Sequence, residues 1–158
     1  MRNRQEGFSL IELLVVVAII LIIAAIAIPN LLSSRMSANE ASAVGSLRTY
    51  ATAMLAYSAQ CENVGFPNDL TGLGPGPGDC TGMGIVDELL GGSVTPSKNG
   101  YAFTYVVVAG VVTNDGYTLN ADPQSRGTTG RRSFYTDQTG VIYYNQSAPA
   151  SPTDPALQ

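Results

Sequence analysis

Residues 7–32 read GFSLIELLVVVAIILIIAAIAIPNLL, and this stretch decides the fold. Between Phe8 and Leu32 its only polar residues are Ser9, Glu12 and Asn30. A helix rises about 1.5 Å per residue, so the stretch is long enough to cross the hydrocarbon core of a bilayer, which is ~30 Å thick. We therefore predict that residues 8–32 form a transmembrane helix.

Two arginines precede the apolar stretch, at Arg2 and Arg4. Basic residues that flank a membrane span tend to remain on the cytoplasmic side. We therefore expect residues 1–7 to lie in the cytoplasm and everything after the span to lie outside it.

The helix is expected to continue well beyond the membrane. From Ser33 to Gln60 the sequence is rich in alanine, the best helix former, and residues recur at three- and four-residue spacing. These residues are Val44, Leu47, Ala51, Met54, Leu55 and Ser58. We predict one helix over residues 8–60, roughly 80 Å long. Pro29 should kink this helix, or begin a second one, because its ring removes a backbone donor and clashes with the preceding turn.

The remaining sequence predicts a small head that contains a sheet. Residues 61–100 are rich in Gly, Pro, Asn and Asp and read as a loop, with a short helical turn over Ile85–Leu90. β-branched and aromatic runs then predict three or four antiparallel strands over residues 101–146. These runs are Tyr101–Val108, which Val111-Val112 could continue, Tyr117–Ala121, Ser133–Thr136 and Val141–Asn145, with turns at Asn114-Asp115-Gly116 and 137–140. The three prolines of residues 147–158 predict a loosely ordered tail. The fold class is α+β, with the helix packed on the sheet.

Composition excludes several classes of function. The formal charge is −4 and there is no histidine, which argues against general nucleic-acid binding and removes the commonest general base and zinc ligand. We find no catalytic set and expect no metal and no cofactor. The two cysteines, Cys61 and Cys80, should form a structural disulfide if this part of the chain is exported.

Glu12 is an acid placed in an apolar span. A charged residue at the centre of a membrane helix costs about 2.5 to 3.5 kcal/mol, so such a residue is a functional candidate that needs a partner. Cleavage after Gly7 would create an α-amine on Phe8, with an unperturbed pKa of about 7.7 to 8.0. Glu12 could pair with this amine in its own chain, or with that of a neighbouring chain and so fix the register between helices.

The string from Gly7 to Glu12, with the basic leader and Pro29, resembles the processing site of type IV pilins and of type II secretion pseudopilins. The resemblance implies a pilin-like fold. It also implies cleavage by a prepilin peptidase between Gly7 and Phe8, N-methylation of Phe8, and assembly into a filament of identical chains guided by Glu12. Pro29 is expected to let the helix bend as the subunit leaves the membrane.

The same resemblance implies partners and a location. The partners are the peptidase, an assembly platform with its ATPase, and minor pilins. The location is the inner membrane for the precursor and the cell surface for the filament. The alternative within the family is a periplasmic pseudopilus that exports proteins.

Three further hypotheses stay open at this point. Ala25-Ile26-Ala27 could be a signal-peptidase site, which would make the chain a secreted binding module. Arg126, Arg131 and Arg132 could bind DNA beside Phe134 and Tyr135, although a solvated turn or pairing with acids is the preferred explanation. Asp115, Asp122 and Asp137 could bind calcium, although Asp in turns is explanation enough.

Overall fold

The computed structural model describes residues 8–110 and 113–157. The chain divides after Arg35 into two compact units, and a single helix, α1 (Leu10–Gln60), runs through both. The predicted helix is therefore confirmed to within two residues. The alternative in which Pro29 begins a second helix is wrong, because α1 continues through Pro29.

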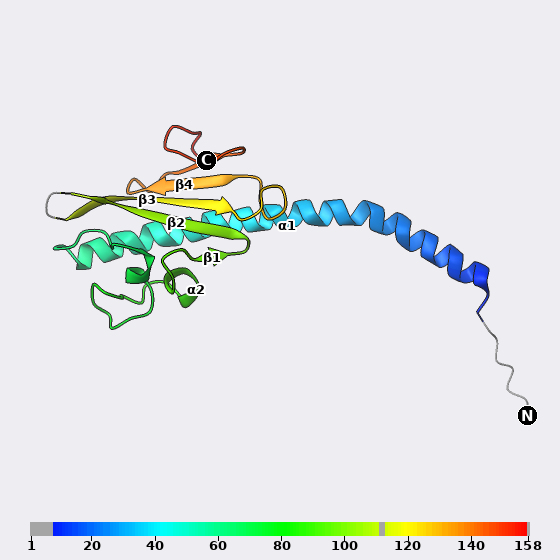
Figure 1. The fold of residues 1–158 in the computed structure, drawn as a ribbon, viewed down its shortest axis with the longest axis horizontal. Coiled ribbons are helices and arrows are strands. Elements are labelled where there is room, and N and C mark those ends of the chain that lie inside the picture. Colours follow the sequence, from blue (N-terminus) through cyan, green and yellow to red (C-terminus); the bar gives the residue numbers. More distant parts are fainter. Residues whose placement is uncertain (1–7, 111–112, 158) are drawn as a thin grey trace, which may run out of the picture. The chain divides into compact units, whose positions relative to one another are not determined.

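The second unit contains an antiparallel sheet in which each strand pairs with the next along the chain (Figure 1). Its strands are β1 (Ser97–Lys98), β2 (Tyr101–Ala109), β3 (Asn114–Pro123), β4 (Ser133–Asp137) and β5 (Ile142–Asn145). Pairs such as Phe103 with Ala121 and Tyr135 with Tyr143 fix the register. The fold class of a helix packed on an antiparallel sheet is confirmed.

Two details of the sheet differ from the sequence prediction. The two-residue strand β1 was not expected, because it is too short to show a pattern. Residues 114–116 belong to β3 rather than to a turn, since Ala109 pairs with Asn114 and Val108 with Gly116. Val111 and Val112 lie outside the described residues.

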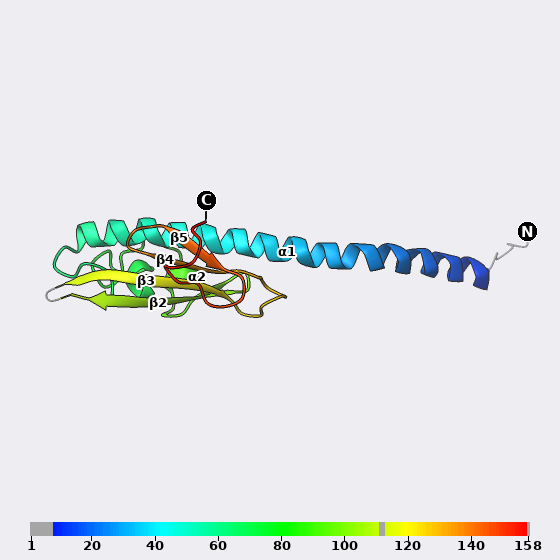
Figure 2. The same cartoon turned by 90° about the horizontal axis from the view of Figure 1, so that it is seen from above.

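One face of the second half of α1 packs against the sheet (Figure 2). Its buried residues follow an alternating spacing of four and three, which keeps them on one side of a helix. The residues with this spacing are Met36, Glu40, Ala43, Leu47, Tyr50, Met54 and Tyr57, and the buried Ser46 and Ala53 flank them. The predicted face was rotated relative to this one: Leu55 is 62% exposed. The prediction left out Tyr50 and Tyr57, which are buried. An aromatic ring can be buried in a core when its hydroxyl has a hydrogen-bond partner.

The segment 61–100 is more ordered than the predicted loop. It contains a 3₁₀ turn, η1 (Leu70–Leu73), and a short helix, α2 (Glu88–Gly91), which starts three residues later than the predicted turn. The Tyr50 hydroxyl donates to the Leu90 carbonyl at 2.7 Å, and the Tyr57 hydroxyl donates to the Cys80 carbonyl at 2.6 Å. Tyr50 and Tyr57 therefore attach this segment to the helix.

A disulfide joins Cys61 to Cys80, as the sequence predicted. Cys61 follows the last residue of α1 and is buried, while Cys80 lies in the segment that the Tyr57 hydroxyl contacts. The bond therefore closes the first part of the 61–100 segment against the end of the helix.

The last residues differ from the expected loose tail. The Leu157 N–H donates to the Ile142 carbonyl at 2.7 Å, and the Tyr144 N–H donates to the Pro155 carbonyl at 3.1 Å. The Asn120 side chain also donates to the Ala150 carbonyl at 2.9 Å. The segment thus covers the outer edge of β5, which would otherwise present unpaired backbone groups.

A partly buried ion pair joins the helix to the turn before β4. Glu40 Oε1 accepts from the N–H groups of Arg131 (2.8 Å) and Arg132 (3.2 Å), and Glu40 Oε2 pairs with Arg132 Nε at 2.7 Å. The Arg132 guanidinium also lies over the rings of Phe134 and Tyr144, 5.5 and 5.6 Å from their centroids. Close packing continues beside this pair, where a Cβ at Gly130 would overlap the Tyr101 hydroxyl.

We expect Glu40→Gln to lower the free energy of unfolding by about 1 to 3 kcal/mol at neutral pH, because partly buried donors lose a charged acceptor. Burial alone would raise the pKa of Glu40, but the bonds from Arg131 and Arg132 outweigh it and lower this pKa. A lowered folded-state pKa stabilises the protein above the unfolded value of about 4.3, and this contribution is lost as the pH falls through the folded-state pKa.

The measurement is urea unfolding of the full chain in detergent micelles at several pH values. The difference between the wild type and Glu40→Gln should shrink in acid. Glu62→Gln, at an exposed glutamate, is the matched control and should change little. If Glu40→Gln were as stable as Glu62→Gln at pH 7, the role given to Glu40 would be contradicted.

Replacing both Cys61 and Cys80 by serine should lower the free energy of unfolding by about 3 kcal/mol, the chain-entropy value for a loop of similar length. Reductant should destabilise the wild type by a similar amount and leave the double variant unchanged. Thermal melting with and without reductant provides the measurement. If reductant opens the disulfide of the wild type but does not lower its melting temperature, this contribution to stability is refuted.

Candidate assembly site on the N-terminal helix

Glu12 stabilises the start of its own helix. The Ser9 N–H donates to Glu12 Oε2 at 2.9 Å, and the Ser9 carbonyl accepts the first helical bond, from the Leu13 N–H at 3.2 Å. The acid at the third helical position thus bonds back to the N–H of the capping residue, which is half of a capping box. Its charge also lies at the positive end of the helix dipole.

Two polar side chains near Pro29 donate hydrogen bonds within the helix. The Asn30 side-chain amide donates to the Ile26 carbonyl at 3.1 Å, and the Ser34 hydroxyl donates to the Asn30 carbonyl at 3.0 Å. Such bonds to the preceding turn satisfy polar atoms where water is absent. The predicted kink at Pro29 stays a prediction.

The first half of α1 exposes its apolar side chains in the single chain. The exposed fraction of the large apolar residues between Phe8 and Leu32 ranges from 42% at Leu32 to 83% at Phe8. By length and composition, α1 is long and apolar enough to cross a membrane. So much apolar surface requires either lipid or protein around it.

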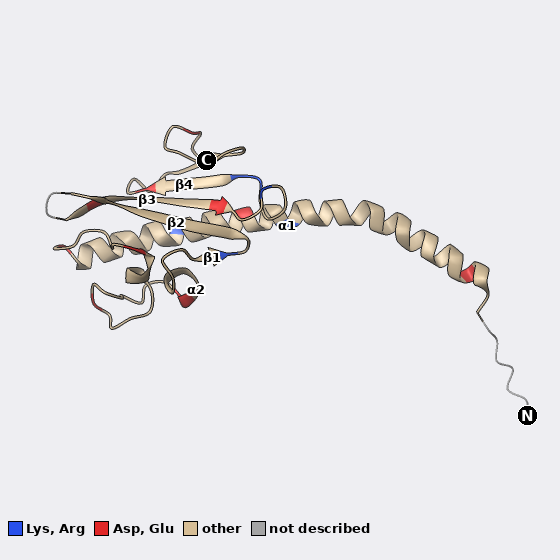
Figure 3. Cartoon of the chain, viewed as in Figure 1, with Lys and Arg blue, Asp and Glu red and all other residues tan. Residues whose placement is uncertain are grey.

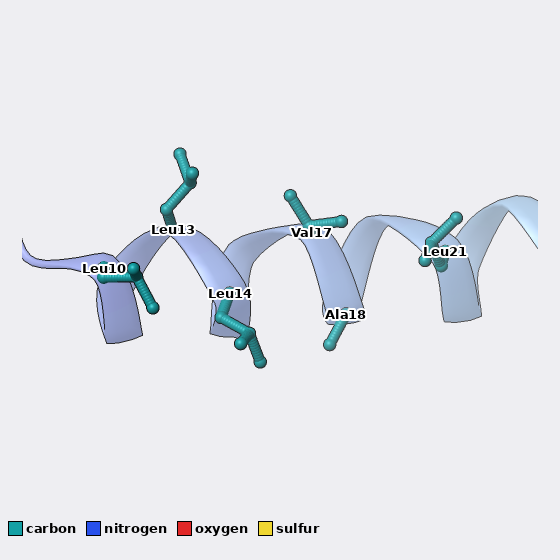
Figure 4. Close-up of a pocket in the computed structure, with 6 residues that line it drawn as sticks. All are labelled: Leu10, Leu13, Leu14, Val17, Ala18 and Leu21. Atoms are coloured by element: carbon teal, nitrogen blue, oxygen red, sulfur yellow. The ribbon is translucent and has the colours of Figure 1, made fainter.

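One side of this half of α1 carries an apolar groove of about 500 Å³ (Figure 4). Leu13 and Val17 project on one side of the groove and Leu14 and Ala18 on the other. The lining residues are Leu10, Leu13, Leu14, Val17, Ala18 and Leu21. Glu12 does not line it, because two residues beyond Leu10 corresponds to about 200° around the helix.

Glu12 is also isolated electrostatically. Figure 3 shows a single acidic band at the start of α1 within an uncharged stretch, and the sequence has no Lys, Arg or His from Phe8 to Ser34. Within the described part of the chain, Glu12 Oε1 has no recorded hydrogen-bond partner. Gly7, on the other side of the predicted cleavage point, lies outside the described residues, as do Arg2 and Arg4.

The arginines near β4 are mostly engaged within the chain. Arg126 donates to the carbonyls of Arg131 (2.6 Å) and Gln146 (2.9 Å) and to the Ser133 hydroxyl (2.7 Å). Arg132 pairs with Glu40. Phe134 is fully buried and cannot stack on a base. This geometry favours a structural role for Arg126 and Arg132 over DNA binding.

The three aspartates proposed for calcium are not brought together as a site. Asp115 accepts from the Thr113 hydroxyl, and Asp137 accepts from the N–H and hydroxyl of Thr139 in the turn between β4 and β5. That turn ends at Gly140, whose φ is 73°. Over the described ranges, no group of three or more acidic, cysteine or histidine side chains could hold a metal ion.

Sequence reasoning missed two roles. The Ser9-Leu10-Ile11-Glu12 string is a capping-box pattern, so the bond from Ser9 could have been found from spacing alone. The burial of Glu40 could not have been found from spacing, because its partners Arg131 and Arg132 lie more than ninety residues away in the chain.

Comparisons with known proteins agree with this geometry. Residues 2–28 match the family model described as the prokaryotic N-terminal methylation motif. Over 136 residues the chain is 30% identical to type II secretion system core protein G of Pseudomonas aeruginosa, covering 80% of this chain and 91% of that protein. The chain belongs to the family of type IV pilins and type II secretion pseudopilins.

Other members of the pilin family match shorter stretches. The chain is 62% identical over 40 residues to the type IV wide pilus major component PilA4 of Thermus thermophilus, which covers 25% of this chain and 30% of that protein. It is 31% identical over 74 residues to core protein G of Dickeya chrysanthemi, covering 47% of each chain. The comparison with solved structures gave no match.

Proposed function

We propose that this chain is a structural subunit of a type IV pilus-like surface filament. Its precursor lies in the inner membrane with residues 1–7 in the cytoplasm. A prepilin peptidase cleaves between Gly7 and Phe8 and methylates the new amine, and the subunit assembles through the first half of α1. The similarity of 40 residues to a pilus major component supports this proposal.

The observation that carries the proposal is the environment of Glu12. One carboxylate oxygen accepts from Ser9, and the first cation after Phe8 in the chain is Arg35. At about 1.5 Å per residue, Arg35 is roughly 35 Å along the helix from Glu12. In this proposal, the positive partner is the amine of a cleaved chain end, either its own or that of a second copy.

Cleavage would supply that cation without destroying the cap. The Ser9 N–H belongs to the Phe8–Ser9 peptide bond, which a cut before Phe8 leaves intact. Glu12 Oε2 can keep this bond while Oε1 pairs with an amine. Because an unpaired carboxylate among apolar helices is costly, pairing with a neighbour's amine would select one axial register.

The remaining partners follow from this role. A subunit that leaves the membrane needs an assembly platform with its ATPase, and minor pilins would begin or modify the filament. In this proposal Pro29 lets α1 bend during extraction, because no N–H of residue 29 bonds to the turn before it. The chain acts by binding copies of itself, and we propose no enzymatic role for it.

A second candidate is a type II secretion pseudopilin that forms a short periplasmic filament. The observation in its favour is the match to core protein G, which extends over most of the chain rather than over the first helix alone. Electron microscopy of sheared surface material separates the two candidates, since long fibres support the pilus and their absence supports the pseudopilus.

The third candidate, a secreted binding module, requires cleavage after Ala27. Mass spectrometry of the mature N-terminus tests this and the main proposal together. A methylated Phe8 supports assembly, whereas a chain that starts near Ile28 would refute it.

Gly7→Glu should leave an uncleaved precursor in the inner membrane, because the peptidase would meet a bulky charge at the predicted cut. Immunoblots of membrane fractions should show a band that is larger than the mature wild type. Glu6→Gln, one residue earlier, is the control and should be processed. Normal processing of Gly7→Glu would count against the predicted site.

Glu12→Gln and Glu12→Val should both insert and be cleaved but assemble poorly. Glutamine can still accept from the Ser9 N–H, whereas valine loses the cap as well as the charge. The yield of filaments in sheared fractions, normalised to mature subunit, is the measurement. If Glu12→Gln assembles normally while Glu12→Val does not, the cap is what matters and charge pairing is wrong.

A further inference from the structure

The end of α1 borders a small polar pocket of about 220 Å³. Its walls come from Tyr57 on the last turn of α1, from residues between Pro67 and Gly72 around η1, and from Cys80 and Thr81. Sites for drug-sized ligands measure ~300 to 1,000 Å³, so this pocket has room for one ring-sized group. The assembly role proposed for the first half of α1 does not use it.

Gly72 keeps an apolar wall of the pocket open. A Cβ at Gly72 would lie 3.0 Å from the Pro67 Cβ and 3.5 Å from Cε2 of the Tyr57 ring. Gly72 is not among the residues with positive φ, so its backbone conformation does not itself require glycine. The missing side chain leaves the Pro67 ring and the edge of the Tyr57 ring open to a guest.

The hydroxyl groups of the wall are oriented by bonds to neighbouring oxygens. The Tyr57 hydroxyl donates to a backbone carbonyl at 2.6 Å. The Thr81 hydroxyl donates to Asp79 Oδ1 at 2.6 Å, and the Thr71 hydroxyl donates to Asp69 Oδ1. Because a hydroxyl has one donor and two acceptor lone pairs, each of these groups can still accept a hydrogen bond from a guest.

Asp69 and Asn68 add a further acceptor and a donor to the pocket. Asp69 Oδ1 accepts from the N–H of Thr71 at 2.8 Å, whereas in the described part of the chain Asp69 Oδ2 has no recorded partner. Asn68 Oδ1 accepts from Asn114 Nδ2 at 3.1 Å, which leaves the Asn68 amide nitrogen as a donor. The pocket therefore combines acceptors, a donor and an apolar wall.

We propose that this pocket binds one ring of a saccharide. Asp69 Oδ2 accepts from one ring hydroxyl, the Asn68 amide donates to another, and a C–H face of the sugar lies against Pro67 and Tyr57. A sugar suits this lining because each of its hydroxyls both donates and accepts. The few bonds and the small contact area imply weak binding, with a Kd in roughly the millimolar range.

A cationic guest fits the lining less well. Burial raises the pKa of Tyr57, and the carboxylates of Asp69 and Asp79 raise it further, so both acids lie near its hydroxyl. This negative charge attracts cations. However, an ammonium group has no acceptor for the Asn68 amide, and it leaves the apolar wall without a partner. A sugar ring satisfies all three parts of the pocket.

The turn that holds Asp69 is not sufficient to make a site. Residues 69–71, 79–81 and 137–139 each contain an aspartate that accepts from the N–H and hydroxyl of a threonine two residues later. Of these three aspartates, Asp69 is the one that lines the pocket. The repeated turn is structural, and it supplies a matched control.

Asp69→Asn and Asp79→Asn form that matched pair. In each variant the remaining side-chain oxygen can still accept from the threonine N–H, so the turn is kept. Asp69→Asn removes the acceptor Oδ2 from the pocket, whereas Asp79→Asn makes the same change at a residue that does not line it. Binding of a sugar should therefore respond to the first substitution and not to the second.

Saturation-transfer difference NMR tests the proposal with the full chain in dodecylphosphocholine micelles, whose head groups carry no sugar that would compete. The probes are glucose, galactose, mannose and N-acetylglucosamine, with spermidine as a cationic probe and protein-free micelles as the blank. We expect at least one sugar to receive saturation at its ring protons. Asp69→Asn should weaken binding of that sugar about tenfold, the effect of losing one hydrogen bond to a charged group.

A pair of glycine substitutions gives a second readout. Gly72→Ala places a methyl group beside Pro67 and Tyr57, and it should reduce binding of the same sugar. Gly45→Ala adds the same methyl group on α1, where nothing lies within 4 Å of it, and should bind as the wild type does. Thermal melting shows whether Gly72→Ala is folded, and Asp69→Asn decides the question if it is not.

Three outcomes would overturn the proposal. The first is the absence of saturation from all four sugars with the wild type. The second is equal binding by the wild type and Asp69→Asn, which would mean that the sugar binds elsewhere. The third is saturation of spermidine alone, which would make the pocket a cation site. Because the pocket belongs to a single chain, none of these outcomes bears on filament assembly.

Discussion

Among the described residues, only one carboxylate oxygen of Glu12 has a hydrogen-bond partner, and the role proposed for the first half of α1 follows from that constraint. One oxygen closes the helix start on the Ser9 N–H at 2.9 Å. The other lies in a stretch without a cation until Arg35. In the proposed filament this acid pairs with the amine of a cleaved chain end, and the apolar surface around it is covered by lipid or protein.

Glu40, on the same helix, shows the opposite arrangement. Its two oxygens accept from two backbone N–H groups and from the Arg132 guanidinium, all within the second unit. The pKa of Glu40 is lowered because these bonds outweigh the effect of burial. Glu40 therefore attaches the second half of the helix to its own head, whereas Glu12 is the glutamate that we propose pairs with a cleaved chain end.

The second unit gains its order from contacts that extend the core beyond helix and sheet. Tyr50 and Tyr57 use their rings in the core and their hydroxyls on the carbonyls of the 61–100 segment. The disulfide at Cys61 holds the same segment at the helix end. The tail covers the edge of β5 through backbone bonds. These contacts give the head a covered sheet edge, whereas the apolar side chains in the first half of α1 are exposed in the single chain.

The sequence by itself determined the long helix, the strand runs, the disulfide candidates and the unusual acid, because apolar periodicity, β-branched runs and an ionisable group in an apolar span are local properties. Only the tertiary structure decided which helix face is buried, the place of residues 114–116 in β3, the order of the tail and the pairing of Glu40 with Arg132. These depend on partners many residues apart, and no local pattern records which distant backbone donor will meet a given carboxylate.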